Sequence, residues 1–266
     1  MEIFGIEIFG LEILLICAIS YFIGSIPFGV IVGRYKGIDI TKLGSGNIGG
    51  TNILRNLGWK WGIFVIACDV LLKGALPPII VMYFIKEPEW LGWLAFLCAA
   101  IGGFFSIFLR FPILFMKKYC MGRWHGGKGV ALVAGGLLAF WGWETLVGLF
   151  VLWLFVLFFF AKGKVSIASM TLAVIVFIIG TIFFLMIPAF IVTGFVLLVI
   201  SAVVWKKHED NRKRLANGQE GSIGFIERFW IDPKGFALQK AQQLVVRAQE
   251  IILKFQNGKK LGKPGS

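Results

Sequence analysis

The chain has 266 residues, of which 58% are hydrophobic and 15% are charged, and its mean hydropathy is +0.84. Because a soluble domain normally carries about 25% charged residues, this composition excludes an ordinary soluble globular protein. The net charge of +13 does not indicate nucleic-acid binding, since basic loops facing anionic headgroups explain most of it in a membrane protein.

Seven apolar segments follow one another along the chain and are predicted to cross the membrane as helices. Their approximate ranges are 11–32, 61–85, 91–111, 130–143, 145–161, 167–187 and 189–204. The fourth and fifth segments run together around Trp143 and Glu144, so six spans are the main alternative. No segment alternates with period two, which argues against an outer-membrane barrel. The expected fold is an all-α integral membrane protein with a bundle of about seven transmembrane helices.

The basic residues lie mostly on one side of this predicted bundle. Lysine and arginine are concentrated between spans one and two, three and four, and five and six, and after span seven, whereas the opposite side keeps only Lys86. By the positive-inside rule the N-terminus is outside and the C-terminus is cytoplasmic. The first ~30 residues lack a basic n-region and a small-residue cleavage pattern, so the first span is expected to be retained. We expect a multi-pass protein of the cell (inner) membrane.

The first of three polar segments on the predicted cytoplasmic side is GSGNIGGTNILRN at positions 44–56. Glycines let the backbone adopt positive φ and approach a ligand closely, and consecutive N–H groups can form an anion-binding nest. Arginine can grip a phosphate in bidentate fashion. A plain connector is the alternative for such a loop. The candidate phosphate-binding residues are Gly44, Gly46, Asn47, Thr51, Asn52 and Arg55, and Ser45 is a candidate catalytic residue.

The second polar segment is GGKG at positions 126–129, where the fourth span begins. Free N–H groups and the helix dipole favour a phosphate at such a helix N-terminus. The spacing of Gly122, Gly127 and Lys128 is close to that of the nucleotide-binding P-loop motif. However, Gly129 replaces the Ser or Thr that would hold Mg²⁺, and no strand precedes the motif, so ATP binding is rejected. The candidate phosphate-binding residues are Gly126, Gly127, Lys128 and Gly129.

The third polar segment, HEDNRKRLANGQE at positions 208–220, follows the last span. His208, Asn211 and Arg214 stand at i, i+3 and i+6, so they share roughly one face of a helix that continues this span. Taken alone, the segment reads as ordinary juxtamembrane basic residues. The combination of three polar segments on one side favours a shared anion site. The catalytic candidates here are His208 and Asn211, and the phosphate-binding candidates are Arg214 and Glu220.

Inside the predicted membrane region, Asp69 and Lys73 stand four residues apart in the second span. That spacing lets the two charges neutralise each other on one helix face, so we favour a structural ion pair over a ligand-binding role. The chain has only two histidines and no CxxC pair, so the sequence predicts no metal site.

Together these motifs resemble the bacterial acyl-phosphate:glycerol-3-phosphate acyltransferase family. The matching stretches occur in order through nearly the whole membrane part. They are GSIPFG (24–29), GSGNIGGTN (44–52) with Arg55, Asp69 with Lys73 and Gly74, GGKGVA (126–131), VSIAS (165–169) and HEDNRKRLANGQE (208–220). The last stretch fits the family pattern H-x-x-N-x-x-R-L-x-x-G-x-E at every fixed position.

The resemblance implies seven spans with an external N-terminus, in agreement with the distribution of charge. It also implies transfer of a fatty acyl group from acyl phosphate to glycerol 3-phosphate, which gives lysophosphatidic acid and phosphate. The implied partners are these two substrates and membrane lipids, with no metal, no cofactor and no nucleic acid. The residues that it implies hold the glycerol phosphate and the acyl-phosphate head are Ser45, Arg55, Lys128, His208 and Asn211.

A membrane transporter or channel for an anionic phosphorylated metabolite is the alternative function, because it would need a similar cationic pocket. A transporter should also carry polar residues through both halves of the membrane and an inverted repeat. The polar segments of this chain all lie on the predicted cytoplasmic side, which favours the enzyme.

The chain departs from the family in an apparent insert at 116–125 and in a longer C-terminal tail. Asp232-Pro233 is a good helix start and Asn257-Gly258 a good stop. The basic, amphipathic stretch between them favours a helix in the headgroup region over a coiled coil or a helix docked on the protein. The predicted organisation is a seven-span acyltransferase domain (1–206), a juxtamembrane active-site motif (207–221) and a cytoplasmic amphipathic helical tail (222–266) that is dispensable for chemistry.

Overall fold

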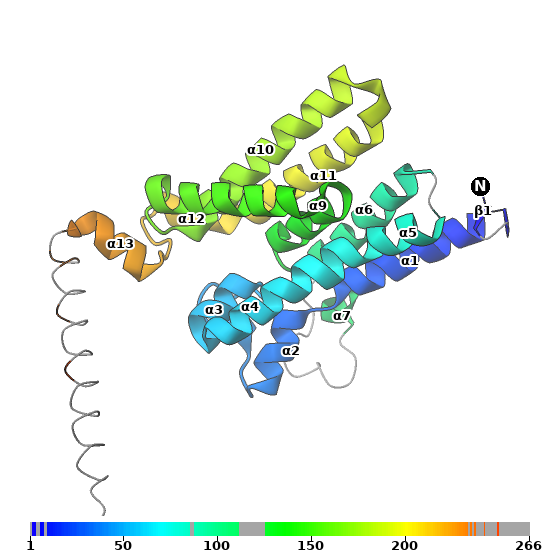
Figure 1. Ribbon diagram of the computed structural model, residues 1–266. Coiled ribbons are helices and arrows are strands. Elements are labelled where there is room, and N and C mark those ends of the chain that lie inside the picture. Colours follow the sequence, from blue (N-terminus) through cyan, green and yellow to red (C-terminus); the bar gives the residue numbers. More distant parts are fainter. Residues whose placement is uncertain are drawn as a thin grey trace, which may run out of the picture.

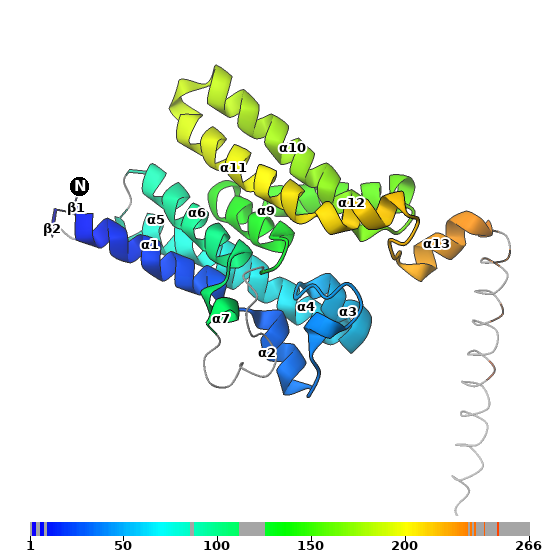
Figure 2. The same cartoon turned by 180° about the vertical axis from the view of Figure 1, so that it is seen from behind.

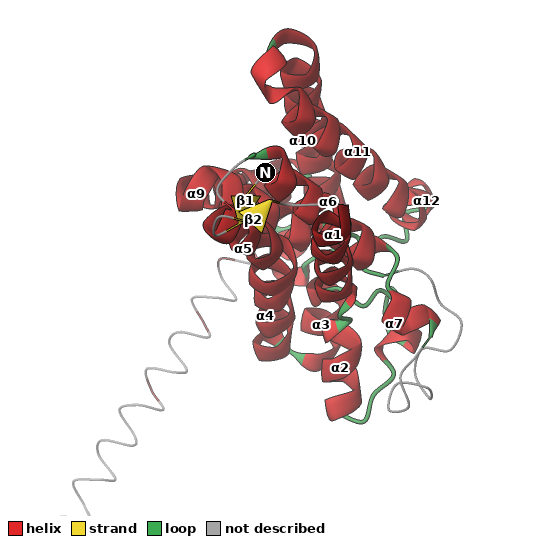
Figure 3. Cartoon of the chain, turned by 90° about the vertical axis from the view of Figure 1, so that its right-hand side faces the viewer, coloured by secondary structure: helices red, strands yellow, loops and turns green. Residues whose placement is uncertain are grey.

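The computed structural model describes residues 10–85, 88–111 and 126–233, the short stretches 2–3 and 6–7, and isolated positions after residue 233 (Figure 1). The insert at 116–125 and nearly all of the tail after residue 233 lie outside this part. Strands β1 (Glu2–Ile3) and β2 (Ile6–Glu7) form a small antiparallel hairpin, and every other regular element of the described part is helical (Figure 3). This confirms the predicted all-α class.

The helical elements of the described part follow one another along the chain. In the first half of the chain they are α1 (Gly10–Ser25), α2 (Phe28–Tyr35), η1 (Ile40–Lys42), α3 (Gly50–Leu57), α4 (Trp59–Cys68), η2 (Asp69–Ala75), α5 (Leu76–Ile85), α6 (Trp90–Phe104) and α7 (Ile107–Arg110). In the second half they are α9 (Val130–Phe155), η3 (Val156–Phe160), α10 (Val165–Met186), η4 (Pro188–Phe190), α11 (Ile191–Lys207), α12 (Glu209–Ala216) and α13 (Gly224–Ile231).

Six helices of the described part are long and apolar enough to cross a membrane. Their ranges are Gly10–Tyr35, Trp59–Ile85, Trp90–Arg110, Val130–Phe160, Val165–Met186 and Pro188–Lys207. Five of them coincide closely with predicted spans, and the sixth, Val130–Phe160, contains both the fourth and the fifth predicted spans.

That longest helix is broken at Gly142, whose φ of 79° and ψ of 179° are not helical. Beyond the break the chain folds back. Leu149 lines the same cavity as Val133, although a straight helix would separate these two residues by about 24 Å. The sequence analysis put the boundary between spans four and five at Trp143 and Glu144, directly after this break. The number of membrane crossings stays a prediction.

Glycines allow several helices to pack with their backbones in contact. A Cβ on Gly24 would lie 1.9 Å from the Ala99 carbonyl oxygen, and one on Gly102 would lie 2.1 Å from the Tyr21 carbonyl oxygen. Helices α1 and α6 therefore cross closely. Gly135 of α9 approaches η2 in the same way, with the Val70 carbonyl oxygen 1.9 Å from its would-be Cβ.

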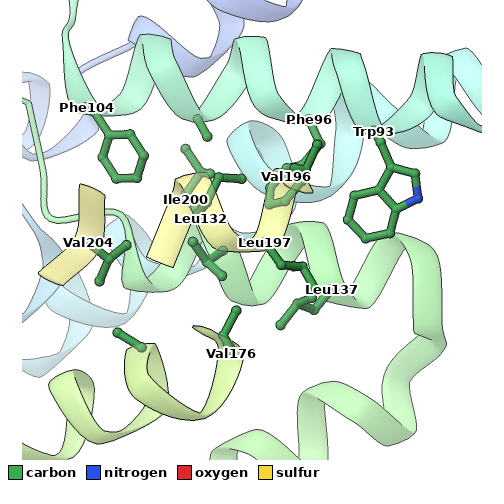
Figure 4. Packing of buried hydrophobic residues seen from close by; sticks show 13 residues of the cluster. Trp93, Phe96, Phe104, Leu132, Leu137, Val176, Val196, Leu197, Ile200 and Val204 are labelled. Carbon is green, nitrogen blue, oxygen red and sulfur yellow. The ribbon is translucent and has the colours of Figure 1, made fainter. Parts of the chain in front are cut away.

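The main hydrophobic core lies where α6, α9, α10 and α11 meet (Figure 4). Phe96 and Phe104 of α6 pack against Leu132 and Leu137 of α9, and Leu197 of α11 is fully buried among them. Seen from behind, α10 and α11 lie side by side, and α12 continues from the end of α11 (Figure 2). This core fixes the start of α9 relative to the end of α11, where two of the three polar segments begin.

Asp69 and Lys73 form an ion pair of 2.7 Å within the π-helical stretch η2. The Lys73 side chain is 8% exposed, and its ammonium also lies 5.3 Å from the centre of the Phe28 ring. Both neighbours of the ammonium are protein groups. The distance is that of a direct ion pair, and the structural role of this pair stays a prediction.

Helix α13 is an element that the sequence analysis did not expect, since it placed the first tail helix after Asp232. Ile226 of α13 is buried against Leu157 and Ala168, and the Trp230 indole N–H donates to the Phe158 carbonyl oxygen (2.7 Å). Asp232 Oδ1 accepts the Gly235 N–H at 2.9 Å, which is the bond that an N-cap makes.

Candidate active site

The three polar segments meet at one end of the bundle, where α3, the start of α9 and α12 come together (Figure 1). The Lys128 ammonium donates to Asn211 Oδ1, which joins the second segment to the third. Arg55 Nη2 donates to the Gly221 carbonyl oxygen at 3.2 Å, which joins the first segment to the residue after the third. Stretches up to 166 positions apart in the sequence thus share one site.

Asn52 holds the glycine-rich loop in its conformation. Its side chain is 4% exposed, and its Nδ2 donates to the carbonyl oxygens of Leu43 (3.0 Å) and Asn47 (2.8 Å). Its Oδ1 accepts the Ser45 N–H at 3.1 Å. Gly44 and Gly46 have φ of 55° and 67°, which glycine adopts without strain. Asn52 therefore shapes the loop and has no spare donor for a ligand.

Four N–H groups of the loop are used within the loop itself. Those of Ser45, Asn47 and Gly49 donate to Asn52 Oδ1, Ser45 Oγ and Asn47 Oδ1, and the Gly46 N–H donates to a carbonyl oxygen. These four N–H groups are therefore not free to bind an anion, whereas the N–H groups of Ile48, Gly50 and Thr51, at the start of α3, have no acceptor in the described part of the chain. Side-chain donors are also present in the exposed Ser45 and Arg55 and the half-buried Thr51.

The glycines of the second segment fit it against the end of α6. The Gly126 N–H donates to the Phe104 carbonyl oxygen at 2.9 Å, and a Cβ on Gly126 would lie 2.0 Å from the Gly103 carbonyl oxygen. Gly129 has a φ of 82°, and a Cβ there would lie 2.2 Å from the Phe104 ring. Within this segment, Gly127 is the only glycine at which an added Cβ would meet no atom within 4 Å. This packing fixes the backbone from which Lys128 reaches Asn211.

The third segment forms a buried polar network on α12. Asn211 is 4% exposed, and its Nδ2 donates to Glu220 Oε1 at 2.7 Å. The other carboxylate oxygen of Glu220 accepts Arg214 Nε at 2.8 Å. Burial alone would raise the pKa of Glu220, but hydrogen bonds from Ser166, Arg214 and Asn211 outweigh it, so the pKa lies below its usual value. Glu220 is thus an ionised group that holds Asn211 and Arg214 in place.

His208 is buried, with 2% of its surface exposed. Its Nδ1 lies 2.8 Å from the Val204 carbonyl oxygen, which can only accept, so Nδ1 carries the proton and Nε2 keeps a lone pair. Burial, with help from Lys128 and Arg212, lowers the pKa of His208 to about 4 despite this hydrogen bond. At neutral pH the ring is therefore an uncharged hydrogen-bond acceptor at Nε2.

Lys128 is a buried cation with two arginines and two acids in its surroundings. Burial lowers the pKa of its ammonium to about 8, and repulsion from Arg214 and Arg55 adds to the effect against the opposing attraction of Glu220 and Asp210. An ammonium whose pKa is lowered in this way gains stability from a nearby anion. The three segments thus form a cationic site that suits a phosphate.

Two residues near the site were not singled out from the sequence. The Lys207 ammonium donates to the Phe104 carbonyl oxygen at 2.6 Å, the same oxygen that accepts the Gly126 N–H. It ties the end of α11 to the second segment. Ser166, at the start of α10, helps to lower the pKa of Glu220. Lys207 looks like any juxtamembrane lysine in sequence, whereas Ser166 lies in a stretch that the family resemblance already included.

A sequence profile of the family described as "Glycerol-3-phosphate acyltransferase" matches residues 14–218. The chain belongs to this family. Its relatives include the glycerol-3-phosphate acyltransferases of Aquifex aeolicus (32% identical, 79% of this chain and 98% of the relative) and Thermosipho melanesiensis (38% identical, 80% of this chain and 93% of the relative). The matched region includes nearly all of the three polar segments and ends two residues before Glu220.

Two crystal structures of PlsY, an integral membrane glycerol 3-phosphate acyltransferase, are similar to this fold. The glycerol 3-phosphate form is 29% identical with a TM-score of 0.66, and it covers 81% of this chain and 98% of that chain. The lysophosphatidic acid form is 28% identical with a TM-score of 0.64 over 82% and 99%. This chain is therefore an integral membrane member of the glycerol-3-phosphate acyltransferase family.

Proposed function

We propose that the protein transfers a fatty acyl group from an acyl phosphate to glycerol 3-phosphate and releases lysophosphatidic acid and phosphate. The observation that carries this proposal is the site at Lys128, because its buried ammonium is repelled by Arg214 and Arg55 and has a neutral amide oxygen, Asn211 Oδ1, as its direct contact. Both substrates bring phosphate groups that would supply the missing charge. Family membership and the two related PlsY forms support the same substrate class.

In this mechanism the glycerol hydroxyl oxygen attacks the acyl carbon and the bond from that carbon to the phosphate oxygen breaks. The proton of the glycerol hydroxyl passes to a phosphate group of the substrates. An acyl phosphate is already activated, so holding the two reactants together can contribute several kcal/mol, up to about 7–11. Lys128, Arg55 and Arg214 reduce the repulsion between the two phosphates and stabilise the charge that develops on the leaving group.

His208 and Asn211 orient the acceptor. A histidine with a pKa of about 4 is a weak base at neutral pH, but its Nε2 can accept a hydrogen bond from the glycerol hydroxyl. Among the described residues, the hydrogen-bond partner of Ser45 Oγ is the Asn47 N–H, not a general base. We therefore assign Ser45 to substrate positioning in a direct transfer rather than to a covalent acyl intermediate.

In this proposal the protein lies in the cell (inner) membrane and its site faces the cytoplasm. The distribution of basic residues supports that orientation through the positive-inside rule. The transporter alternative has less support, since the related structures are named as acyltransferases.

The test uses the purified full-length protein with palmitoyl phosphate and glycerol 3-phosphate, with phosphate and lysophosphatidic acid both measured. We expect release of phosphate that depends on glycerol 3-phosphate, and severe loss in Arg55→Ala, His208→Ala and Asn211→Ala. Lys213→Ala is the matched control, because this lysine is one residue from Arg214 but is 67% exposed and paired with Glu209. No acceptor-dependent release, together with uptake of glycerol 3-phosphate into proteoliposomes, would instead establish the transporter.

A further inference from the structure

Two adjoining apolar cavities lie between α9, α10 and α11. The first begins beside the candidate site, since its lining includes Val130, two residues after Lys128, and Val204, whose carbonyl oxygen contacts His208. The second has a volume of about 260 Å³ and extends the same space deeper into the bundle. Leu137, from α9, and Val176, from α10, line both (Figure 4). The two cavities therefore adjoin, with the smaller one, of about 50 Å³, nearer the polar site and the larger one nearer the apolar interior.

The hydroxyl groups along this space are already hydrogen-bonded within the protein. Ser201 Oγ donates to the Leu197 carbonyl oxygen at 2.6 Å, and Ser169 Oγ accepts the Trp153 indole N–H at 3.3 Å. Thr145 Oγ1 donates to the Trp141 carbonyl oxygen at 3.0 Å, which leaves the threonine methyl for the cavity. The lining thus offers an occupant little hydrogen bonding, and a hydrocarbon chain is the ligand that needs none.

Aromatic rings stand at the deep end of the space. Trp141 and Phe183 both line the larger cavity, and their rings meet edge to face with centroids 5.9 Å apart. Behind them, Phe183 stacks on Phe190 at 5.3 Å and Trp141 contacts Trp93 at 6.1 Å. Because these two rings pack against further aromatic rings, we expect them to keep their positions and to limit how far an occupant can extend.

The depth of the space matches one leaflet of a bilayer. Val130 and Trp141 are separated by eleven helical rises, or about 16 Å. Half of a hydrocarbon core of about 30 Å is about 15 Å, the depth that one fatty acyl chain fills. We propose that this space holds the acyl chain of the donor, and that Trp141 and Phe183 set the longest chain that the enzyme accepts. This inference rests on the proposed acyltransferase function.

The test compares lauroyl, palmitoyl and arachidoyl phosphate as donors in two variants that change the deep end in opposite directions. Phe183→Ala removes a ring at the deep end of the cavity and lets a longer chain enter. The kcat/KM for arachidoyl phosphate relative to palmitoyl phosphate should therefore rise about tenfold or more, since even one methylene in an apolar pocket changes kcat/KM by about tenfold. Thr145→Phe fills the cavity, so preference should move toward lauroyl phosphate. Phe177→Ala is the matched control, because Phe177 lies on α10 but is 46% exposed on the outer surface.

A second readout does not depend on turnover. Palmitoyl phosphate with a photoreactive group at the end of its chain should label α9 or α10 near Thr145 and Phe183. Identical chain-length profiles in the wild type and both variants would overturn the proposal that Trp141 and Phe183 set the longest accepted chain. The proposed acyltransferase function would still stand. Labelling confined to outward-facing residues would overturn the acyl-chain cavity. Labelling at the deep end without acyl transfer from any donor would support the cavity and refute the proposed function.

Discussion

Raising the pH through about 8 should weaken the use of glycerol 3-phosphate, because the Lys128 ammonium then loses its proton. Burial, together with Arg214 and Arg55, lowers the pKa of this group from 10.5 to about 8. In the proposed mechanism the charged form binds the phosphate. Binding is therefore strongest below this pKa and declines above it. Because kcat/KM reports the free enzyme, its basic limb should show the lowered pKa rather than the value in the complex.

The size of the effect follows from the same pKa. A value of about 8 in place of 10.5 means that the empty site disfavours the ammonium by about 3 kcal/mol. A bound phosphate removes much of that penalty through a charge-assisted hydrogen bond, which typically contributes about 1.5–3 kcal/mol. Lys128→Met, which has no charge, should therefore lower kcat/KM by roughly 10- to 100-fold near neutral pH.

The assay is kcat/KM for glycerol 3-phosphate from about pH 6 to about pH 10, with palmitoyl phosphate held far below its own KM so that the titrating enzyme has neither phosphate bound. Lys128→Arg stays charged over this range, so its basic limb near pH 8 should disappear, and Lys128→Met should lack the limb as well. His208, with a pKa of about 4, should add no limb in the range. An acid limb near pH 6 would come from the second ionisation of the substrate phosphate. A basic limb that persists unchanged in Lys128→Met would refute this reasoning.

Three other outcomes are expected. Lysophosphatidic acid should form without divalent metal, and activity abolished by EDTA and restored by Mg²⁺ would contradict the mechanism. Asn52→Ala should lower thermal stability in detergent by about 2–4 kcal/mol, because it removes several buried hydrogen bonds of about 1 kcal/mol each, whereas Ser45→Ala should change kinetics with an unchanged Tm; equal effects on Tm would refute this division. Truncation after Gly221 should leave near-normal turnover in detergent, since α13 packs on η3 rather than on the polar segments, and complete loss in folded protein would show that the tail completes the site.

Most of the fold could be predicted because a bilayer imposes simple requirements. Apolar helices must be long enough to cross it, and hydropathy located them to within a few residues. The break at Gly142 was harder, since one glycine in an apolar run fits equally well inside a helix or at a turn. Its φ of 79° depends on how α9 packs on α10 and α11, which no local pattern reveals. Helix α13 was missed because the helix-start signal at Asp232-Pro233 placed the first tail helix later in the chain.

The sequence predicted which residues make up the site, but not which of them shape the loop and which are free to bind an anion. Glycine-rich loops suggested free N–H groups, yet the side chains of Ser45, Asn47 and Asn52 occupy several of them. The residue types that bind anions are the same ones that cap turns, so the sequence alone does not separate these roles. Lys207 was overlooked for a similar reason, because a lysine that anchors a carbonyl oxygen looks like one that faces headgroups.

The contacts that join the three segments suggest why a phosphate should complete the site. Arg55 reaches the third segment through one carbonyl oxygen, and Lys128 reaches it through one amide oxygen, so neither cation meets a full negative charge in its direct contact. Glu220 is already engaged by Arg214 and Asn211. A dianionic phosphate beside Lys128 would give both cations a strong acceptor and would raise the lowered pKa of the lysine. Substrate binding and the alignment of three distant segments would then be stabilised by the same charge.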